Sequence, residues 1–146
     1  MARVTASVII DRTPAQVWAA VEDIGTHVNW MHDAVAIRFV SDQRSGVGTL
    51  FDCDTKVGPF KLVDRMEITQ WVPEQTMGVR HVGLVTGTGA FHLRAQGDAG
   101  TEFLWDEELT FPWWMGGPIG GRIGAVVLGQ IWKRNLRGLK RQIEGA

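Results

Sequence analysis

Three ionisable side chains, Asp64, His81 and Glu107, fall where apolar residues are expected in stretches of alternating sequence. Successive residues of a strand face opposite sides of a sheet, so each is predicted to share a face with apolar neighbours two positions away. Burying an isolated charge is unfavourable, so a carboxylate there must be paired, hydrated or protonated. Glu107 is therefore predicted to have a raised pKa and to act as an acid or base. His81 is predicted to donate to a ligand carbonyl or to act as a general base.

Each of these positions also has a purely structural interpretation. A bulge near Glu107 would send its side chain to solvent, and His81 at the end of a strand can be part of a hydrogen-bonded framework. Asp64 would pair with a basic neighbour such as Arg80 if the strand phase slipped. On the predicted phase, Arg80 and Arg94 face solvent.

The apolar positions on the same strand phases predict the wall of a small-molecule cavity. A wide apolar surface interrupted by a few polar groups is typical of such pockets. The predicted wall consists of Phe51, Phe60, Leu62, Asp64, Met66, Met77, Val79, Phe91, Leu93, Phe103, Trp105 and Leu109, joined by Trp113, Trp114, Val127 and Ile131 from the C-terminal part of the chain.

Two adjacent tryptophans, Trp113 and Trp114, lie between the last predicted strand and the long C-terminal helix. They are expected to form a lip at the cavity entrance, because two neighbouring indoles on one loop are difficult to bury together. A Gly-rich loop beside them would help such an entrance to open. The alternative is that they plug one end of the core.

Other chemistry has weaker support in the sequence. His27, His32 and Asp33 resemble metal ligands by type, but a five-residue spacing does not place two imidazoles on one side of a helix, and no third His is nearby. Cys53 is predicted to be a small buried residue, since no basic neighbour is evident to lower its pKa. We therefore predict no metal site and no cofactor.

Length and composition indicate one globular domain over residues 1–146. The formal charge of −1 provides no field for holding a phosphate backbone, so nucleic acid is not an expected partner. A single cysteine excludes an internal disulfide, and the N-terminus does not have the pattern of a signal peptide. We expect a cytoplasmic protein that is a monomer or a homodimer.

Hydrophobic periodicity predicts a strand at residues 3–10, followed by a helix that starts with Thr13, Pro14 and Gln16 as a capping box and ends near Asp23. A second short helical segment begins at Gly25. Six further strands are predicted between residues 35 and 111, with breaks at 45–48, 58–59, 73–74, 83–89 and 97–100. They are expected to form an antiparallel meander, followed by a long helix over residues 119–144.

The apolar run from Phe111 to Trp132 is long enough to raise the question of a membrane span, because Arg122 is its only charged residue. Its prolines and glycines, and the amphipathic sequence that follows, argue against a span. We predict no integral membrane segment and expect the start of this run to pack over the mouth of a core.

This order of elements resembles the helix-grip fold of the START-like, or SRPBCC, superfamily, in particular its polyketide cyclase/dehydrase family. The sequence segments on which the resemblance rests are residues 8–18 (VIIDRTPAQVW), Trp30, the turn at residues 46–49 (GVGT) and residues 71–74 (WVPE). The resemblance spans the chain and implies an α+β fold, in which a seven-stranded curved antiparallel sheet wraps around a long C-terminal helix and encloses an apolar cavity. Cyclases of the superfamily are thought to use Arg and Tyr, whereas this chain has no Tyr.

Three hypotheses about function follow. The first is binding, with or without transport or sequestration, of a hydrophobic small molecule such as a lipid, a polyketide or an aromatic metabolite. The second is a polyketide cyclase, aromatase or dehydratase in which His81 and Glu107 exchange protons with the substrate. The third is a protein-interaction module that uses its edge strands or the Trp113–Trp114 patch.

Overall fold

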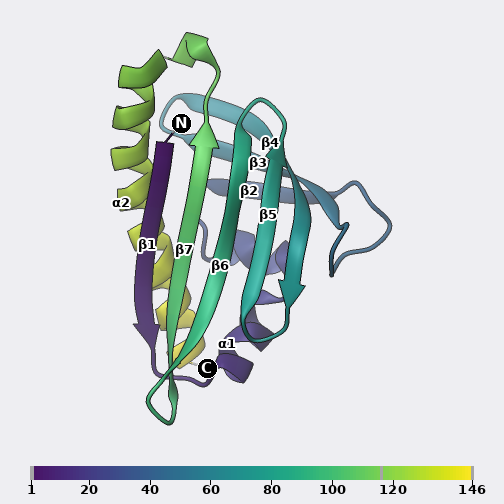
Figure 1. The fold of residues 1–146 in the computed structure, drawn as a ribbon, viewed down its shortest axis with the longest axis vertical. Helices are drawn as coiled ribbons and strands as arrows, with labels where there is room; N and C mark the ends of the chain where they lie inside the picture. The colour runs from purple at the N-terminus through teal and green to yellow at the C-terminus, as the bar shows by residue number, and fades with distance from the viewer. Residues whose placement is uncertain (1, 116, 146) are drawn as a thin grey trace.

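One antiparallel sheet forms most of the molecule (Figure 1). The computed structural model describes residues 2–115 and 117–145. The strands are β1 (Ala2–Ile10), β2 (Ala34–Phe39), β3 (Leu50–Val57), β4 (Phe60–Val72), β5 (Thr76–Val82), β6 (Thr86–Gln96) and β7 (Gly100–Thr110). Their order in the sheet is β1-β7-β6-β5-β4-β3-β2, so the last six form a meander and β1 pairs with β7. The predicted seven-stranded antiparallel sheet is confirmed.

Four helical segments accompany the sheet: α1 (Pro14–Val21), the 3-10 helices η1 (Ile24–Asn29) and η2 (Trp113–Met115), and α2 (Gly117–Glu144). The predicted capping box of α1 is present. Gln16 N donates to Thr13 Oγ1 at 3.2 Å, and Thr13 N donates to Gln16 Oε1 at 3.0 Å. These two bonds satisfy amides that the start of a helix leaves without partners.

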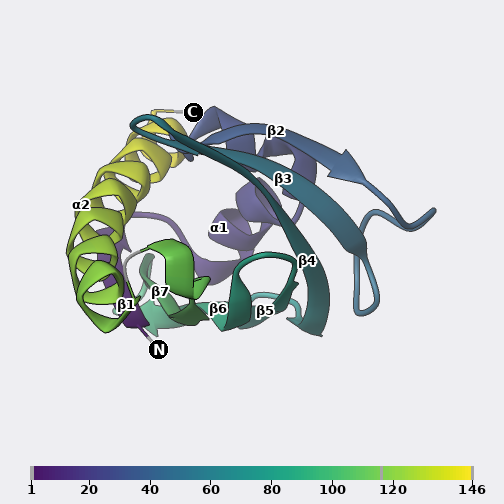
Figure 2. The same ribbon diagram turned by 90° about the horizontal axis from the view of Figure 1, so that it is seen from above.

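The sheet is strongly curved (Figure 2). Viewed from above, it bends from β1, β7, β6 and β5 into β4, β3 and β2, and α2 lies across the side that the bend leaves open. The segment α1 lies near one end of this arrangement, close to the C-terminus (Figure 1). The curved sheet gripping a long C-terminal helix is the architecture predicted from the order of elements.

The C-terminal half of α2 is packed tightly at that end. Its inward side chains Trp132, Leu136, Leu139 and Ile143 are buried in the main core. Hydrogen bonds fasten the last turn to the end of β1: Lys140 Nζ donates to the carbonyl of Ile9 at 2.6 Å. The backbone N–H of Asp11 donates to Glu144 Oε2 at 2.8 Å.

Aromatic contacts fix the middle of α2 against the sheet. Trp132 stacks on Trp105 of β7 with ring centroids 4.1 Å apart and planes 5° from parallel. Trp30 meets the edge of Trp105 and also contacts Phe91 and Phe103. Aromatic pairs of this kind contribute stability beyond the apolar area that they bury. The cluster therefore links the end of η1, α2 and the sheet.

The glycine-rich segment between β5 and β6 differs from the prediction. The turn is confined to residues 83–85, whereas Gly87 and Gly89 belong to β6. Gly87 has φ +131°, and a Cβ atom there would lie 1.9 Å from the carbonyl oxygen of Glu108. Close approach of β7, rather than a turn, therefore explains the glycine at this position.

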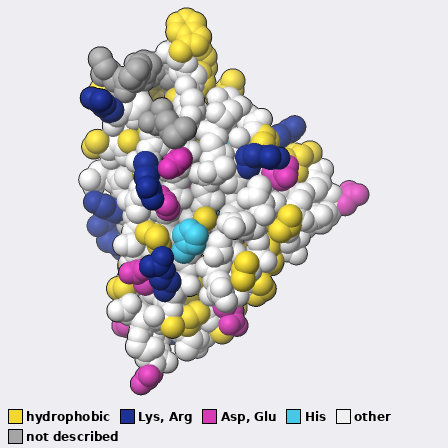
Figure 3. Space-filling view, viewed as in Figure 1, with side chains coloured by type: hydrophobic (Ala, Val, Ile, Leu, Met, Phe, Trp, Pro, Cys, Tyr) yellow, Lys and Arg dark blue, Asp and Glu magenta, His cyan; other side chains and the backbone are white. Residues whose placement is uncertain are grey.

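The apolar run at residues 111–132 consists of the end of the sheet, η2 and the first half of α2. Within the described residues, no helix combines the length and the apolar character needed to cross a membrane. On the outer face of the sheet, positive and negative side chains are interspersed with scattered hydrophobic ones (Figure 3). Two of the pairs on strands of the sheet are Arg3 with Asp106 and Arg80 with Glu67.

Candidate functional site

A cavity of about 390 Å³ lies between the concave face of the sheet, η1 and the N-terminal half of α2. Most of the predicted wall residues line it. They are Phe51, Phe60, Leu62, Asp64, Met66, Met77, Val79, Phe91, Trp105, Leu109 and Val127, together with the predicted acid–base pair His81 and Glu107.

Three other predicted wall residues lie in the packed core instead. Leu93 and Phe103 are buried and face each other across β6 and β7, at a level that Trp30 fills. Ile131 is partly buried and packs against the core, because the next residue, Trp132, takes the inward position on α2. Alternation along a strand predicts the face on which a residue lies but not its depth along the cavity.

The predicted lip residues, Trp113 and Trp114, are both exposed. Trp113 is 84% exposed and Trp114 is 58% exposed. They are on η2, which follows the sheet, and neither side chain lines the cavity wall. The described wall near this end is formed by Phe111 of the preceding loop and by Gly120, Ile123 and Gly124 of α2.

Several wall residues were missed by the sequence analysis. They come from η1 and the segment after it, from β2 and β3, from the β5–β6 turn and β6, and from the middle of α2: Ile24, His27, Met31, Asp33, Ala34, Ile37, Thr55, Val85, Ala90, Leu128 and Trp132 are among them. The apolar stripe of α2 was a usable signal for Leu128 and Trp132. Short segments such as η1 have no periodicity long enough to show which side faces inward.

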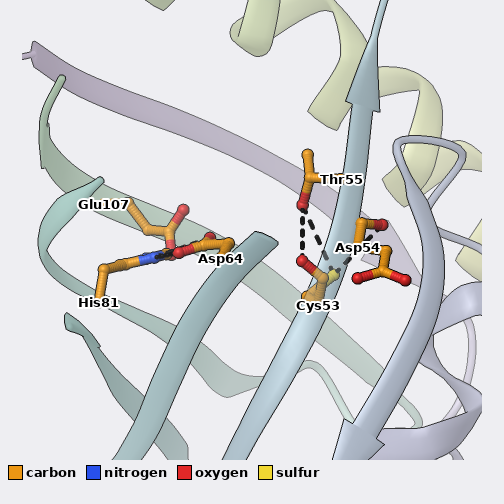
Figure 4. Close-up of polar contacts among 6 residues, drawn as sticks. All are labelled: Cys53, Asp54, Thr55, Asp64, His81 and Glu107. Carbon is orange, nitrogen blue, oxygen red and sulfur yellow. Dashed lines mark hydrogen bonds and ion pairs between the residues drawn. The ribbon is translucent and has the colours of Figure 1, made fainter. Parts of the chain in front are cut away.

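Asp64, His81 and Glu107 meet in one buried cluster on the cavity wall (Figure 4). His81 Nδ1 lies 2.9 Å from each carboxylate oxygen of Asp64, and His81 Nε2 lies 2.8 Å from Glu107 Oε1. The residues come from β4, β5 and β7 respectively. The imidazole therefore donates from both nitrogens when it carries two protons.

Glycine on the intervening strand allows Glu107 to reach His81. Gly89 of β6 pairs directly with Glu107 of β7. A Cβ atom on Gly89 would lie 2.0 Å from Glu107 Cγ, a distance that no real contact allows. The Glu107 side chain thus lies over the bare backbone of β6 and contacts β5. No register shift occurs along β7, so the alternative of a bulge at Glu107 is wrong.

The cluster shifts the pKa of two of its members. Burial lowers the pKa of His81, but hydrogen bonds to Asp64 and Glu107 outweigh it and raise that pKa to about 10. His81 is therefore an imidazolium at neutral pH. Burial also raises the pKa of Glu107, against the opposing effect of His81. The alternative partner of Asp64, Arg80, is on the outer face and contacts Glu67 at 3.1 Å.

The other titratable groups on the wall are uncharged at neutral pH or tied to the framework. Burial lowers the pKa of His27 to about 4, and its Nε2–H donates to the carbonyl of Val21 at 2.7 Å. Burial raises the pKa of the Cys53 thiol, which lies beside Thr55 on β3 (Figure 4), to about 12. Asp33 Oδ1 accepts a hydrogen bond from Asn135 Nδ2 of α2 at 2.8 Å.

Comparison with protein families gives a match over residues 1–144 to the family described as polyketide cyclase / dehydrase and lipid transport. The chain belongs to this family. The match covers nearly the whole sequence, as the resemblance in the order of elements had implied. The description of the family thus names both polyketide cyclase or dehydrase activity and lipid transport.

Solved structures of other proteins share the fold of this chain. A START superfamily protein from Mycobacterium smegmatis has a TM-score of 0.80 at 12% identity and covers 98% of this chain and 97% of its own. A conserved protein from Geobacillus kaustophilus has a TM-score of 0.78 at 15% identity, with 98% and 95% covered. The Zhui aromatase/cyclase from Streptomyces sp. R1128 has a TM-score of 0.75 at 12% identity, with 97% and 93% covered. No curated protein sequence matches this chain.

Proposed function

We propose that this protein binds a hydrophobic small molecule, such as a lipid, a polyketide or another aromatic metabolite, in the cavity between the sheet and α2. The observation that carries the proposal is the cavity itself, which has an apolar wall and one buried charged cluster. Membership of a family described by polyketide chemistry and lipid transport supports the same class of ligand. Transport or sequestration would use the same binding step.

Affinity would come chiefly from apolar burial. A ligand that buries about 200 Å² of apolar surface gains about 5 kcal/mol before the costs of association are subtracted. The cluster of Asp64, His81 and Glu107 would orient the ligand, because it is the charged interruption of the apolar sheet face. This division between apolar affinity and polar orientation is common in small-molecule sites.

Binding can be tested with N-phenyl-1-naphthylamine, an uncharged probe that fluoresces strongly in apolar surroundings. We expect a saturable rise in fluorescence, lost in Leu62→Trp and retained in Val63→Trp. Leu62 lines the cavity, whereas its neighbour Val63 is exposed on the other face of β4, so the two variants add an indole on opposite sides. Equal binding by both variants, or no saturable binding by the wild type, would overturn the proposal.

The geometry of the charged cluster favours a second candidate, an enzyme of the cyclase, aromatase or dehydratase type. Glu107, with its raised pKa, and His81 share a short hydrogen bond beside the cavity. Ring closure and dehydration both require a proton to leave carbon and a proton to reach an oxygen, which such a pair can mediate. Ala substitutions at His81 and Glu107, assayed for turnover of a linear poly-β-keto thioester and for its binding, separate the two functions. A carrier loses affinity only, whereas an enzyme loses turnover while binding persists.

A further inference from the structure

The ionisable groups on the cavity wall are mainly acidic. Asp33, Asp64 and Glu107 are the carboxyl groups on the wall. Among the described residues, no Lys or Arg side chain lines it, and residues 115–119 contain no charged residue in the sequence. The nearby lysines Lys56 and Lys61 are exposed and do not belong to the wall. An anionic head group would therefore meet carboxyl groups rather than a cation.

Among the described wall residues, His81 is the one cation, and both of its ring N–H groups already have partners. Its Nδ1 is shared between the two oxygens of Asp64, and its Nε2 is bonded to Glu107. It has no third N–H to offer to a ligand carboxylate or phosphate. His27 offers no replacement, because its Nε2–H is taken by Val21 and the ring is neutral near pH 7.

We infer that the natural ligand is a hydrophobic amine, whose ammonium group lies against the carboxyl groups of Glu107 and Asp64 while its apolar body fills the cavity. The inference rests on the proposed binding function and names its ligand class. An ammonium has three donors and no acceptor, which suits a site where the available oxygens are carboxylate acceptors. The same carboxyl groups disfavour ligands with a carboxylate or phosphate head.

Two observations favour an organic cation over other occupants. Within residues 2–115 and 117–145, no three His, Cys, Asp or Glu side chains are arranged to hold a metal ion. The apolar wall that surrounds the cluster, including Trp105 and Leu109, suits a hydrocarbon or aromatic body attached to the charge. A neutral ligand would bury the same apolar surface but would not balance the carboxyl groups.

Binding of an amine should also favour the ionised form of Glu107. In the empty cavity, burial favours the neutral form of Glu107. The titratable groups that face it are His81 on β5 and Asp64 on β4, while Gly89 of β6 and the part of α2 that lines the cavity present none. An arriving ammonium favours ionised Glu107, so it should lower the pKa of that carboxyl group.

Three ligands with the same ten-carbon chain test the inference: decylamine, decanol and decanoate, each competing with N-phenyl-1-naphthylamine at pH 7. We expect decylamine to bind about tenfold or more tightly than decanoate, with decanol between them, because only the amine forms charge-assisted hydrogen bonds to the carboxyl groups.

A matched pair of variants tests whether Glu107 is responsible for the preference for the amine. Glu107→Gln should reduce the preference for the amine, whereas Glu108→Gln, which changes an exposed carboxylate at the next position of β7, should leave it unchanged. Decanoate binding as tightly as decylamine overturns the inference but leaves the binding function intact. If none of the three ligands displaces the probe and the probe itself does not bind, the proposed function fails instead. The ligand ranking on the wild type decides the matter even where a variant does not fold.

Discussion

The two halves of α2 show how one amphipathic pattern can produce either a core or a cavity. From Trp132 to Ile143 the inward side chains are buried, and Leu136 and Leu139 have 0% exposure. From Gly120 to Ile131 none of the described side chains is fully buried, although apolar residues continue at helical spacing. Glycine occupies four positions in this first stretch and one between 132 and 144. Small residues on the hollow half leave space that Trp and Leu fill on the packed half.

The largest difference should appear when the same substitution is made in each half. Leu136→Ala should lower the free energy of unfolding by about 2–5 kcal/mol, because it leaves a hole in a closed core. Leu128→Ala should cost about 1 kcal/mol or less, since Leu128 already faces a cavity. Urea unfolding of the two variants measures both values. Equal losses would show that the two halves are packed alike.

The two buried histidines should give the molecule opposite responses to pH. The pKa of His81 is about 10 when folded, above the ordinary 6.5, so the folded state holds a proton that the unfolded state lacks. The stability that this provides is complete below pH 6.5 and decreases as the pH rises towards 10, at about 1.4 kcal/mol per pH unit for one proton. The pKa of His27 is about 4, so the unfolded state takes up the proton first. Its contribution is lost as the pH falls from 6.5 towards 4.

The free energy of unfolding of the wild type, His81→Gln and His27→Gln, measured from pH 4 to pH 10, tests both contributions. We call its decrease above pH 6.5 the alkaline limb and its decrease below pH 6.5 the acid limb. His81→Gln should flatten the alkaline limb and leave the acid limb in place, whereas His27→Gln should have the converse effect. An alkaline limb that persists in His81→Gln would mean that His81 is neutral in the folded protein and that the cluster is not assembled as described.

A side chain at Gly89 of β6 should disturb the structure around Glu107. Gly89→Ala places a methyl group where the Glu107 side chain lies, and the overpacking should cost about 1–3 kcal/mol. In a Glu107→Ala background the same change should cost much less, since the clash is with the atoms beyond Cβ of Glu107. A double-mutant cycle on unfolding free energies measures this coupling. Additive effects would indicate that Gly89 is needed for its backbone alone.

The smallest effect concerns Cys53, the single cysteine of the chain, which lines the cavity. Its thiol, with a pKa of about 12, should react slowly with iodoacetamide at pH 8, because little thiolate is present. Saturating N-phenyl-1-naphthylamine should slow the reaction further by filling the space beside it. Mass spectrometry of the modified fraction over time measures both rates, and an unchanged rate with bound probe would place the probe elsewhere.

The fold could be predicted from the sequence because each element has a local signal. Alternation, the capping box at Thr13 and the stripe of α2 determine the order and type of the elements, and the observed sheet follows from them. Alternation also placed Asp64, His81 and Glu107 on the inner face. It could not show that they touch, because their contact depends on the strand registers and on the bare backbone at Gly89.

Two residues predicted on the cavity wall lie in the core because their positions also depend on contacts between distant parts of the chain. Leu93 and Phe103 are on the predicted face but at the level of Trp30, where the space is filled. Depth along a strand is determined by elements that pack against the sheet from elsewhere in the chain. Trp113 and Trp114 are exposed on η2, as expected for two adjacent indoles that are difficult to bury together, and their place at the cavity entrance stays a prediction.

The indole N–H resonances of the seven tryptophans offer the most direct test of where the ligand binds. Two of them, Trp105 and Trp132, line the cavity, whereas Trp113 and Trp114 lie outside it. In ¹H–¹⁵N spectra recorded while N-phenyl-1-naphthylamine is added, we expect Trp105 and Trp132 to shift and saturate together, and Trp113 and Trp114 to stay in place. Shifts confined to Trp113 and Trp114 would contradict binding in the cavity and would make the exposed surface the binding site.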